Sequence, residues 1–280
     1  MPKWMRLKPG EKQAQGRRTR AMTATTDSKS QAGVTTAEGM TVDGPWDIEV
    51  RGLWKSFGAL PVLRGLSLRV RAGERLVIVG PNGSGKTTLI RILATLLRPS
   101  RGEVRVAGFD TRRQGDEVRR HVGVLCHQAL LYGELTAREN IEFYGRMYGV
   151  ADPAGRASEL LRTVGLEGQA NTMTRTLSRG MQQRLALARA IVHEPLVLLL
   201  DEPDTGLDQH GAGVLRDLVT DGAAQGRTTL LTTHNLERDL EMADRVAILN
   251  GGRMVFSASR ESLDVARLKE AYHHHTRRTA

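Results

Sequence analysis

The sequence predicts an α/β fold, in which a mixed core sheet is joined by an antiparallel N-terminal β-subdomain and by an inserted α-helical subdomain. Residues 46–57 and 61–70 alternate apolar and polar side chains, a pattern typical of antiparallel strands with one wet face. Three continuous apolar runs alternate with helical segments, which favours parallel strands. These runs are RLVIVG, LVLLLD and TTLLTTH. A helix-rich stretch over about residues 129–191 lies between core strands and predicts the insertion.

Local patterns justify the helices in turn. After the first apolar run, leucine and isoleucine recur at helical spacing, so a helix is expected to run until Pro99 stops it. The residues that set this spacing are Leu89, Ile92, Leu93, Leu96 and Leu97. Thr136 and Glu139 form a capping-box pattern that predicts the start of a second helix. Further helices are expected over residues 153–166 and after Ser178, which occupies an N-cap position.

Composition limits the classes to which this chain can belong. Its 280 residues suit one large domain with tails, and no apolar run approaches the roughly 20 residues that a membrane helix needs. The single cysteine, Cys126, excludes an intramolecular disulfide and favours a reducing compartment such as the cytoplasm. The net charge of +10 suggests an anionic partner, either nucleic acid or a membrane surface. Part of this charge lies in residues 1–44, where eight Lys or Arg oppose four Asp or Glu.

The two ends of the chain differ from the regular region between them. Residues 1–44 are rich in small polar residues without apolar periodicity, so we expect a disordered basic extension. One domain is expected over residues 45–258, followed by a C-terminal tail over residues 259–280. The run His273–His275 raises the question of a metal site, but three adjacent histidines offer no fixed ligand geometry. A frayed basic end is therefore expected there.

The segment GPNGSGKT predicts a nucleoside triphosphate site. It follows an apolar strand and opens a helix, and its glycines allow backbone N–H groups to surround phosphate oxygens. Lys86 is placed to reach the β- and γ-phosphates, and the Thr87 hydroxyl is placed to bind Mg²⁺. The nucleotide-binding candidates of this segment are Gly80, Asn82, Gly83, Ser84, Gly85, Lys86, Thr87 and Thr88. ATP and Mg²⁺ are the expected cofactors.

Polar residues at two other strand ends predict the chemistry of hydrolysis. Asp201 and Glu202 close the run LVLLLD, where one acid can hold Mg²⁺ and the next can orient or deprotonate the attacking water. We assign Asp201 to the metal and Glu202 to the water. His234 closes TTLLTTH on the same side of the predicted sheet, where its ring can bond a γ-phosphate or the water.

This ordered set of motifs resembles the nucleotide-binding subunit of ABC (ATP-binding cassette) transporters over residues 45 to about 256. The matching motifs are GPNGSGKT, Gln128, LSRGMQQR, LLLDEP, GLD and His234. The resemblance implies that residues 45–258 are an ABC ATPase domain. It also implies that Phe57, 29 positions before Lys86, stacks on adenine. Gln128 would lie near Mg²⁺ and the attacking water, in a loop that meets the membrane partner.

The resemblance further implies a composite site shared by two copies of the chain. Ser178 and Gly180 of one copy would contact the γ-phosphate held by the other, and Asp208 would communicate between the two sites. The implied partners are a second copy of the chain and transmembrane permease subunits, on the cytoplasmic face of the plasma membrane. No nucleic acid partner is expected. Three positions depart from the usual family pattern and receive no catalytic role: Arg179, Met181 and Asp204.

Three functional classes compete for this chain. A transporter motor explains all the motifs. A soluble ABC protein acting on nucleic acid or ribosomes would usually carry two fused cassettes, zinc motifs or coiled-coil insertions, and a P-loop kinase or small GTPase would not explain the LSRGM helix. Within the transporter class, the segments around LATLLRPSRGEVRVAGFD and LSRGMQQRLALARAIVHEP look like the ATP-binding subunit of the cytochrome c maturation system, a heme exporter type. The ATP-binding subunit of a drug or antibiotic exporter is the alternative.

Overall fold

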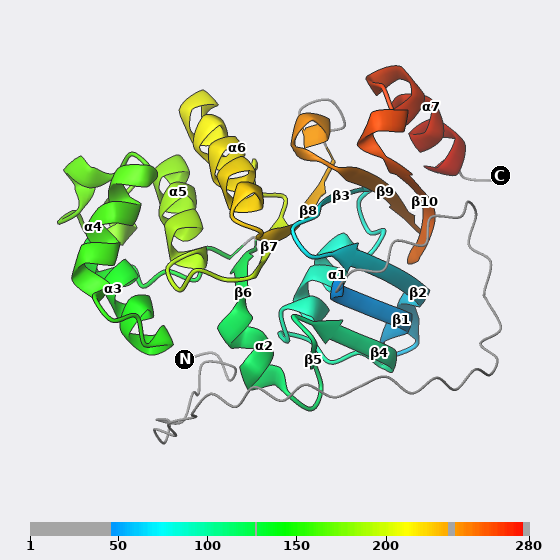
Figure 1. The fold of residues 1–280 in the computed structure, drawn as a ribbon, viewed down its shortest axis with the longest axis horizontal. Helices are drawn as coiled ribbons and strands as arrows, with labels where there is room; N and C mark the ends of the chain where they lie inside the picture. Colours follow the sequence, from blue (N-terminus) through cyan, green and yellow to red (C-terminus); the bar gives the residue numbers. More distant parts are fainter. Residues whose placement is uncertain (1–45, 127, 235–238, 277–280) are drawn as a thin grey trace, which may run out of the picture. The chain divides into compact units, whose positions relative to one another are not determined.

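The computed structural model describes residues 46–126, 128–234 and 239–276. The basic extension expected over residues 1–44 lies outside the described residues, as does His127. Within the described part of the chain, the strands form a four-stranded and a six-stranded sheet (Figure 1). The two sheets and the helices between them bear out the expected α/β fold with its antiparallel and mixed sheets.

The four-stranded sheet is antiparallel and has the order β2-β1-β4-β5. Its strands are β1 (Trp46–Phe57), β2 (Leu60–Arg71), β4 (Arg101–Val106) and β5 (Phe109–Asp110). Alternation of the sequence places Val50 and Leu68 opposite each other on the buried face, while Glu49 and Arg69 pair on the other face. The two alternating segments at the start of the regular region therefore form the hairpin that their pattern predicts.

The six-stranded sheet has the order β10-β9-β3-β8-β7-β6. Its strands are β3 (Arg75–Val79), β6 (Val122–Leu125), β7 (Val197–Asp201), β8 (Thr228–Thr233), β9 (Arg245–Asn250) and β10 (Arg253–Ser259). Adjacent strands are parallel except for β10, which runs antiparallel to β9. Because β3, β8 and β7 are neighbours and parallel, their carboxyl ends lie along one edge of the sheet.

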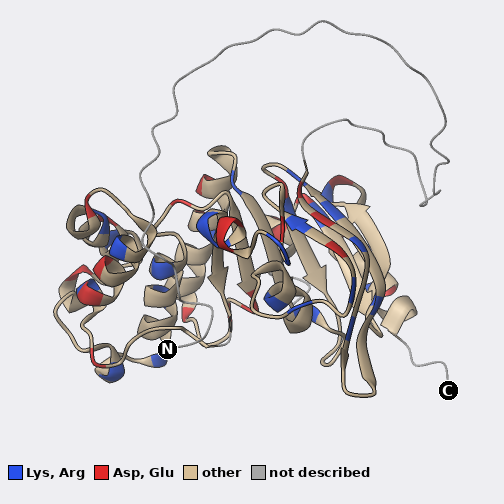
Figure 2. Cartoon of the chain, turned by 90° about the horizontal axis from the view of Figure 1, so that it is seen from below, with Lys and Arg blue, Asp and Glu red and all other residues tan. Residues whose placement is uncertain are grey.

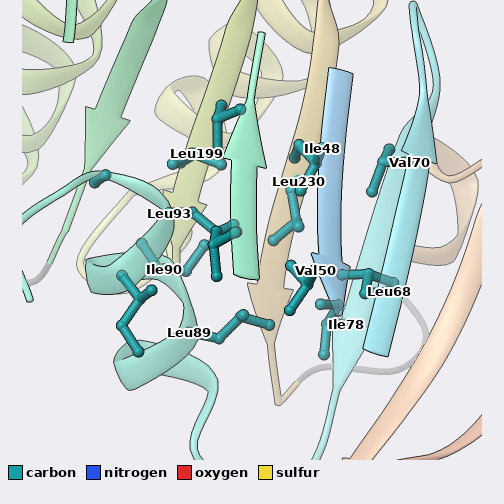
Figure 3. Close-up of a cluster of buried hydrophobic side chains, with 14 of the residues drawn as sticks. Ile48, Val50, Leu68, Val70, Ile78, Leu89, Ile90, Leu93, Leu199 and Leu230 are labelled. Atoms are coloured by element: carbon teal, nitrogen blue, oxygen red, sulfur yellow. The ribbon is translucent and has the colours of Figure 1, made fainter. Parts of the chain in front are cut away.

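The helix α1 (Lys86–Leu93) packs between the two sheets and supplies much of the core. Figure 3 shows Leu89, Ile90 and Leu93 of α1 beside side chains from β1, β2, β3, β7 and β8. These three residues are fully buried. The core therefore fixes the first turn of α1, and with it the loop before the helix, against both sheets.

Helix α1 ends earlier than the leucine spacing predicts. The helix stops at Leu93, and Thr95 adopts a left-handed backbone with φ of 60°. The N–H groups of Leu96 and Leu97 then both donate to the carbonyl of Arg91, which closes the helix. The prediction of a helix running to Pro99 is wrong, because Leu96 and Leu97 continue the helical spacing but pack against the core from a turn, where they are partly buried.

The next helices lie in the connections between strands, except for the short turn η5, which follows β10. They are α2 (Gly115–His121), α3 (Ala137–Tyr148), α4 (Pro153–Thr163), α5 (Arg179–Ala190) and α6 (Gln209–Ala224), with short 3-10 turns η2 (Glu167–Gln169), η3 (Thr174–Thr176), η4 (Asp239–Met242) and η5 (Arg260–Ser262). Helices α3 to α5 fall between β6 and β7 and lie together in Figure 1. The capping box of Thr136 and Glu139 is confirmed, and the Ser178 hydroxyl accepts from the Met181 N–H at 3.3 Å as the N-cap of α5.

The C-terminal residues differ from the frayed end that the sequence suggests. Residues Val265–Thr276 form the helix α7, and Leu268 on this helix is fully buried. The Asn250 amide donates to the backbone oxygen of His275 at 2.7 Å, so the histidine run belongs to a helix held against β9. Burial of Leu268 and the side-chain hydrogen bond from Asn250 both favour an ordered helix here, and neither is revealed by the charge of the segment.

Basic and acidic residues are interspersed over the described elements (Figure 2). On the antiparallel sheet, for example, Glu49 lies within ion-pair distance of both Arg51 and Arg69. None of the helices in the described ranges is both long enough and apolar enough to cross a bilayer.

Acid is expected to destabilise the domain through His193, which follows α5. Its ring stacks on Tyr148 with centroids 3.8 Å apart, and burial lowers its pKa from 6.5 to about 4. A lowered folded-state pKa gives stability that is present above pH 6.5 and is lost as the pH falls toward 4. Between pH 7 and pH 5 this site is expected to lower the free energy of unfolding by about 2 kcal/mol.

Urea unfolding of the wild type and of His193→Phe at both pH values measures this contribution. Phenylalanine keeps a ring against Tyr148 but cannot bind a proton, so the variant should lose less stability between pH 7 and pH 5 than the wild type. An equal loss in the two proteins would mean that other groups take up the protons.

Candidate nucleotide-binding and hydrolysis site

The predicted site residues of three strands meet at one edge of the six-stranded sheet. The loop after β3 leads into α1, Asp201 and Glu202 lie at the end of β7, and His234 follows β8. Because β8 lies between β3 and β7, these three chain segments are neighbours in space. The structure thus brings together residues that are up to 154 positions apart in the sequence.

The glycines of the loop after β3 are required by its shape. A methyl group on Gly80 would lie 2.2 Å from the backbone oxygen of Leu249, so the loop approaches β9 too closely for any side chain. Gly83 and Gly85 have φ of 78° and 109°, conformations that favour glycine. Asn82 is exposed, Thr87 and Thr88 are partly buried, and the buried Ser84 hydroxyl has no hydrogen-bond partner within the described part of the chain. A polar cradle of this kind fits phosphate oxygens.

The Lys86 ammonium is held inside the loop. Its side chain is 5% exposed, and Nζ donates to the Gly80 carbonyl at 2.7 Å and lies 3.7 Å from Oε1 of Glu202. Burial lowers the pKa of Lys86, and the negative charges of Glu202 and Asp201 oppose that shift. The loop therefore holds one cation beside two acids, so a bound phosphate would need Mg²⁺ as well as Lys86 to offset the negative charge.

The acids at the end of β7 are fixed by the neighbouring strand. The Thr232 hydroxyl of β8 donates to Oδ1 of buried Asp201 at 2.7 Å, and the Glu202 N–H donates to the Thr232 carbonyl at 2.9 Å. Glu202 has a φ of 49°, which is uncommon for a residue with a side chain and turns its carboxylate out of the strand. Its Oε2 lies 3.5 Å from Nδ1 of His234, while Oε1 faces Lys86.

The donor set suits Mg²⁺ bound together with phosphate. The Thr87 hydroxyl and the Asp201 carboxylate are hard oxygen ligands, the type that Mg²⁺ prefers. Within the ranges that the structure describes, no group of three His, Cys, Asp or Glu side chains could hold a metal. A magnesium ion that keeps several waters and uses substrate phosphates needs only one or two protein ligands, so the residues present fit it.

Phe57 and Gln128 lie at the ends of strands other than the three that lead to Lys86, Glu202 and His234. Phe57 ends β1, its ring is 49% exposed, and the Lys55 ammonium lies 5.0 Å from the ring centroid. Gln128 is exposed and follows β6, which borders β7, and its backbone oxygen accepts from the Cys126 thiol at 3.2 Å. An exposed aromatic face can accept a base, and the exposed amide can reach a ligand.

The start of α5 lies beside the loop that follows Glu202. A methyl group on Gly180 would lie 3.3 Å from the backbone oxygen of Gly206, and Ser178 is exposed at the helix N-terminus. Asp208 caps α6 by accepting from the Gly211 N–H at 2.7 Å. The contact between α5 and the loop encloses a cavity of about 190 Å³. The residues that line it are Ala129, Arg179, Gln182, Gln183, Asp201, Glu202 and Thr205.

Several residues at or beside this cavity are not among the predicted site residues. Arg179, Gln182 and Gln183 face the cavity from one side of α5, and Thr232 supports Asp201 from β8. Helical spacing offers the signal that could have found the first three, because positions i, i+3 and i+4 share a helix face. No local pattern marks Thr232, whose role depends on strand order.

Comparison with known proteins decides the family. A family model described as "ABC transporter" matches residues 63–205, which include the phosphate loop, α5, and the two acids Asp201 and Glu202. The chain belongs to the ABC transporter family. It carries the ATP-binding motor domain of that family, and the expected ABC ATPase fold is confirmed by the solved structures that it matches.

Two relatives and one solved structure illustrate the similarity of this ABC protein to others. The chain is 41% identical over 218 residues to the daunorubicin resistance ATP-binding protein DrrA3 of Streptomyces coeruleorubidus, covering 77% of this chain and 69% of the relative. It is 38% identical over 224 residues to a fluoroquinolones export ATP-binding protein of Mycobacterium tuberculosis, covering 79% and 73%. A solved ATP-binding cassette, a dimer in a post-hydrolysis state bound to ADP and Pi, matches with a TM-score of 0.69 and 29% identity, covering 77% of this chain and 100% of that chain.

These relatives correct one expectation for the ABC protein. The sequence suggested a heme exporter of the cytochrome c maturation type, with drug or antibiotic export as the alternative. The relatives are named for drug resistance and drug export, so the alternative is the better supported interpretation and heme export is not supported.

Proposed function

We propose that this chain is the ATP-hydrolysing subunit of an ABC exporter that carries a drug or antibiotic. The observation that carries the proposal is the convergence of Lys86, Glu202 and His234 at one sheet edge, with Glu202 within 3.7 Å of both other side chains. The names of its relatives support the class of cargo. The cargo itself would be bound by transmembrane permease subunits, and the chain would sit on the cytoplasmic face of the membrane.

In this proposal the residues of the phosphate loop and of the strand ends have stated tasks. The loop N–H groups and Lys86 bind the phosphates of ATP, and Phe57 stacks on the adenine. Thr87 and Asp201 would hold Mg²⁺, with the amide of Gln128 beside the ion, and the ion would neutralise phosphate charge. Glu202 takes a proton from the attacking water, and His234 and Gln128 orient that water. The 3.5 Å approach of His234 to Glu202 supports their joint action on one water.

The proposed active form is a head-to-tail pair of chains. Ser178 and Gly180 at the start of α5 would contact the γ-phosphate held by the other copy, where the positive end of the helix favours an anion. Asp208 would link the two sites. The exposure of Ser178 supports this arrangement, because its hydroxyl is accessible to a second copy.

The class of cargo can be tested in cells in which the chain carries Glu202→Gln. Drug export predicts that these cells become several-fold more susceptible to daunorubicin or a fluoroquinolone, while their content of c-type cytochromes is unchanged. Susceptibility is measured as the minimal inhibitory concentration, and cytochromes by heme staining. The matched control is Glu167→Gln, which changes a carboxylate that is 68% exposed outside the site. Unchanged susceptibility would contradict the proposal of drug export. If susceptibility is unchanged and the content of c-type cytochromes falls, heme export would be favoured.

A further inference from the structure

The side chain of Arg179 contacts the loop that follows Glu202 in the same chain. Arg179 is the first residue of α5. A methyl group placed on Gly206 would lie 3.1 Å from Nε of Arg179 and 3.5 Å from both Cγ and Cδ. The contact therefore uses the stem of the arginine as well as its guanidinium. Gly206 has a φ of 86°, and its lack of a side chain leaves room for this stem.

Two more contacts join α5 to the same loop. The Gln183 amide, one turn further along the helix, donates to the backbone oxygen of Pro203 at 3.2 Å. The Cα of Gly180 faces the backbone oxygen of Gly206 so closely that an added methyl group would lie 3.3 Å from it. The loop from Pro203 to Gly206 is thus held from one side by three residues on the first turns of α5.

Within the described residues Arg179 forms no ion pair with an acid, and the buried Oδ1 of Asp204 in the same loop has no hydrogen-bond partner. A cation at the N-terminus of a helix opposes the positive end of the helix dipole. The carboxylate of Glu202, which lines the same cavity, pairs with Lys86 and approaches His234. The side chain of Arg179 lies along its own chain beside Gly206. The geometry therefore indicates that the aliphatic part of the Arg179 side chain packs on Gly206.

We infer that Arg179 is a positioning residue, which packs on Gly206 and holds the loop after Glu202 against the start of α5. The inference rests on the proposed function, in which that loop joins the base Glu202 to the linking residue Asp208. The backbone of this loop begins in the left-handed conformation of Glu202, so it needs contacts to keep one geometry. Loosening the loop would lower the fraction of molecules in which the carboxylate faces the water.

Steady-state ATP hydrolysis by the full chain tests this inference with four substitutions at the contact. Arg179→Ala removes the stem and is expected to lower kcat about tenfold while the Kd for ATP is unchanged, because the phosphate loop is not altered. Arg179→Met and Arg179→Lys keep a stem of similar length, and both are expected to restore most of the turnover lost in the alanine variant. Gly206→Ala should lower kcat as well, since its methyl group would displace the arginine.

Two further variants separate the contact from its side effects. Gly226→Ala is the matched control, because Gly226 also has a positive φ, of 81°, but has open space around it. It should leave kcat unchanged. In the double variant Arg179→Ala/Gly206→Ala, the fold-decrease in kcat should be smaller than the product of the fold-decreases in the two single variants. The reason is that each single substitution removes the same contact. Thermal unfolding midpoints establish that each variant is folded.

The outcomes distinguish this inference from the function on which it rests. A wild-type chain that neither binds nor hydrolyses ATP would contradict the proposed function. If the wild type is active, an unchanged kcat in Arg179→Ala, or drops that multiply in the double variant, would overturn the positioning role. Loss of turnover in Arg179→Met with full turnover in Arg179→Lys would also overturn it, because a charge acting on phosphate would then be the cause.

Discussion

Replacing Glu202 with glutamine is expected to lower the rate of ATP hydrolysis by about 100-fold or more while ATP binding is retained. Glutamine keeps the size of the side chain but removes the basicity and the negative charge. Lys86, 3.7 Å from the carboxylate, remains in the phosphate loop and can still bind phosphate. The loss of one opposing acid should make this loop more favourable for an anion. Phosphate release measures turnover, and calorimetric titration with ATP and Mg²⁺ measures affinity.

The Glu202 variant is also expected to accumulate as an ATP-bound dimer, because the trapped nucleotide would bridge two copies. Size-exclusion chromatography with ATP, compared with ADP, detects that dimer. The control is Glu167→Gln, whose carboxylate is exposed and should not affect turnover. Turnover close to that of the wild type in Glu202→Gln would remove Glu202 from the role of base.

Replacing Lys86 with alanine is expected to weaken ATP binding by about 100-fold or more, which corresponds to about 3 kcal/mol. The reason is that the loop would lose the one cation whose ammonium lies inside it, 2.7 Å from the Gly80 carbonyl. Without nucleotide, the variant leaves that carbonyl without its donor, so the free energy of unfolding should fall by about 1 kcal/mol. Calorimetric titration measures the affinity, and urea unfolding without nucleotide measures the stability.

Lys86→Met separates the charge from the packing of the stem. The methionine side chain fills the buried channel of the lysine stem, so it should recover stability relative to alanine but not ATP affinity. If the affinity for ATP is unchanged in both Lys86 variants, the phosphates of ATP do not bind beside Lys86.

The fold around the phosphate loop could be predicted because its signals are local. The strand before Gly80 is a continuous apolar run, the loop has its glycines at fixed spacing, and Lys86 follows six residues after Gly80. Each of these signals lies within one turn or one strand. The capping residues Thr136 and Ser178 are equally local, which is why both helix starts are found from the sequence.

Contacts between distant segments could not be predicted from such signals. The hydrogen bond from Thr232 to Asp201 joins residues 31 positions apart and requires that β7 and β8 be neighbours. The contact of Arg179 with Gly206 joins α5, which precedes β7 in the sequence, to the loop that follows β7. Helix α7 was missed because its order depends on a few contacts with β9 and β10. The class of cargo is likewise not encoded in these local motifs, and the names of the relatives were needed to choose between the two exporter types.

In the proposed function, the hydrogen bond between Thr232 and Asp201 would make Mg²⁺ binding depend on strand alignment. The two residues are partners in the ladder of β7 and β8, and side chains alternate between the faces of a sheet. A slip of β8 by one residue would bring Leu231 or Thr233 opposite Asp201 and turn the hydroxyl of Thr232 to the other face. One oxygen of the Asp201 carboxylate would then lose its donor and the side chain its fixed orientation. If Asp201 holds Mg²⁺ as proposed, substitutions in the apolar middle of this sheet would change the affinity for the ion without replacing a ligand.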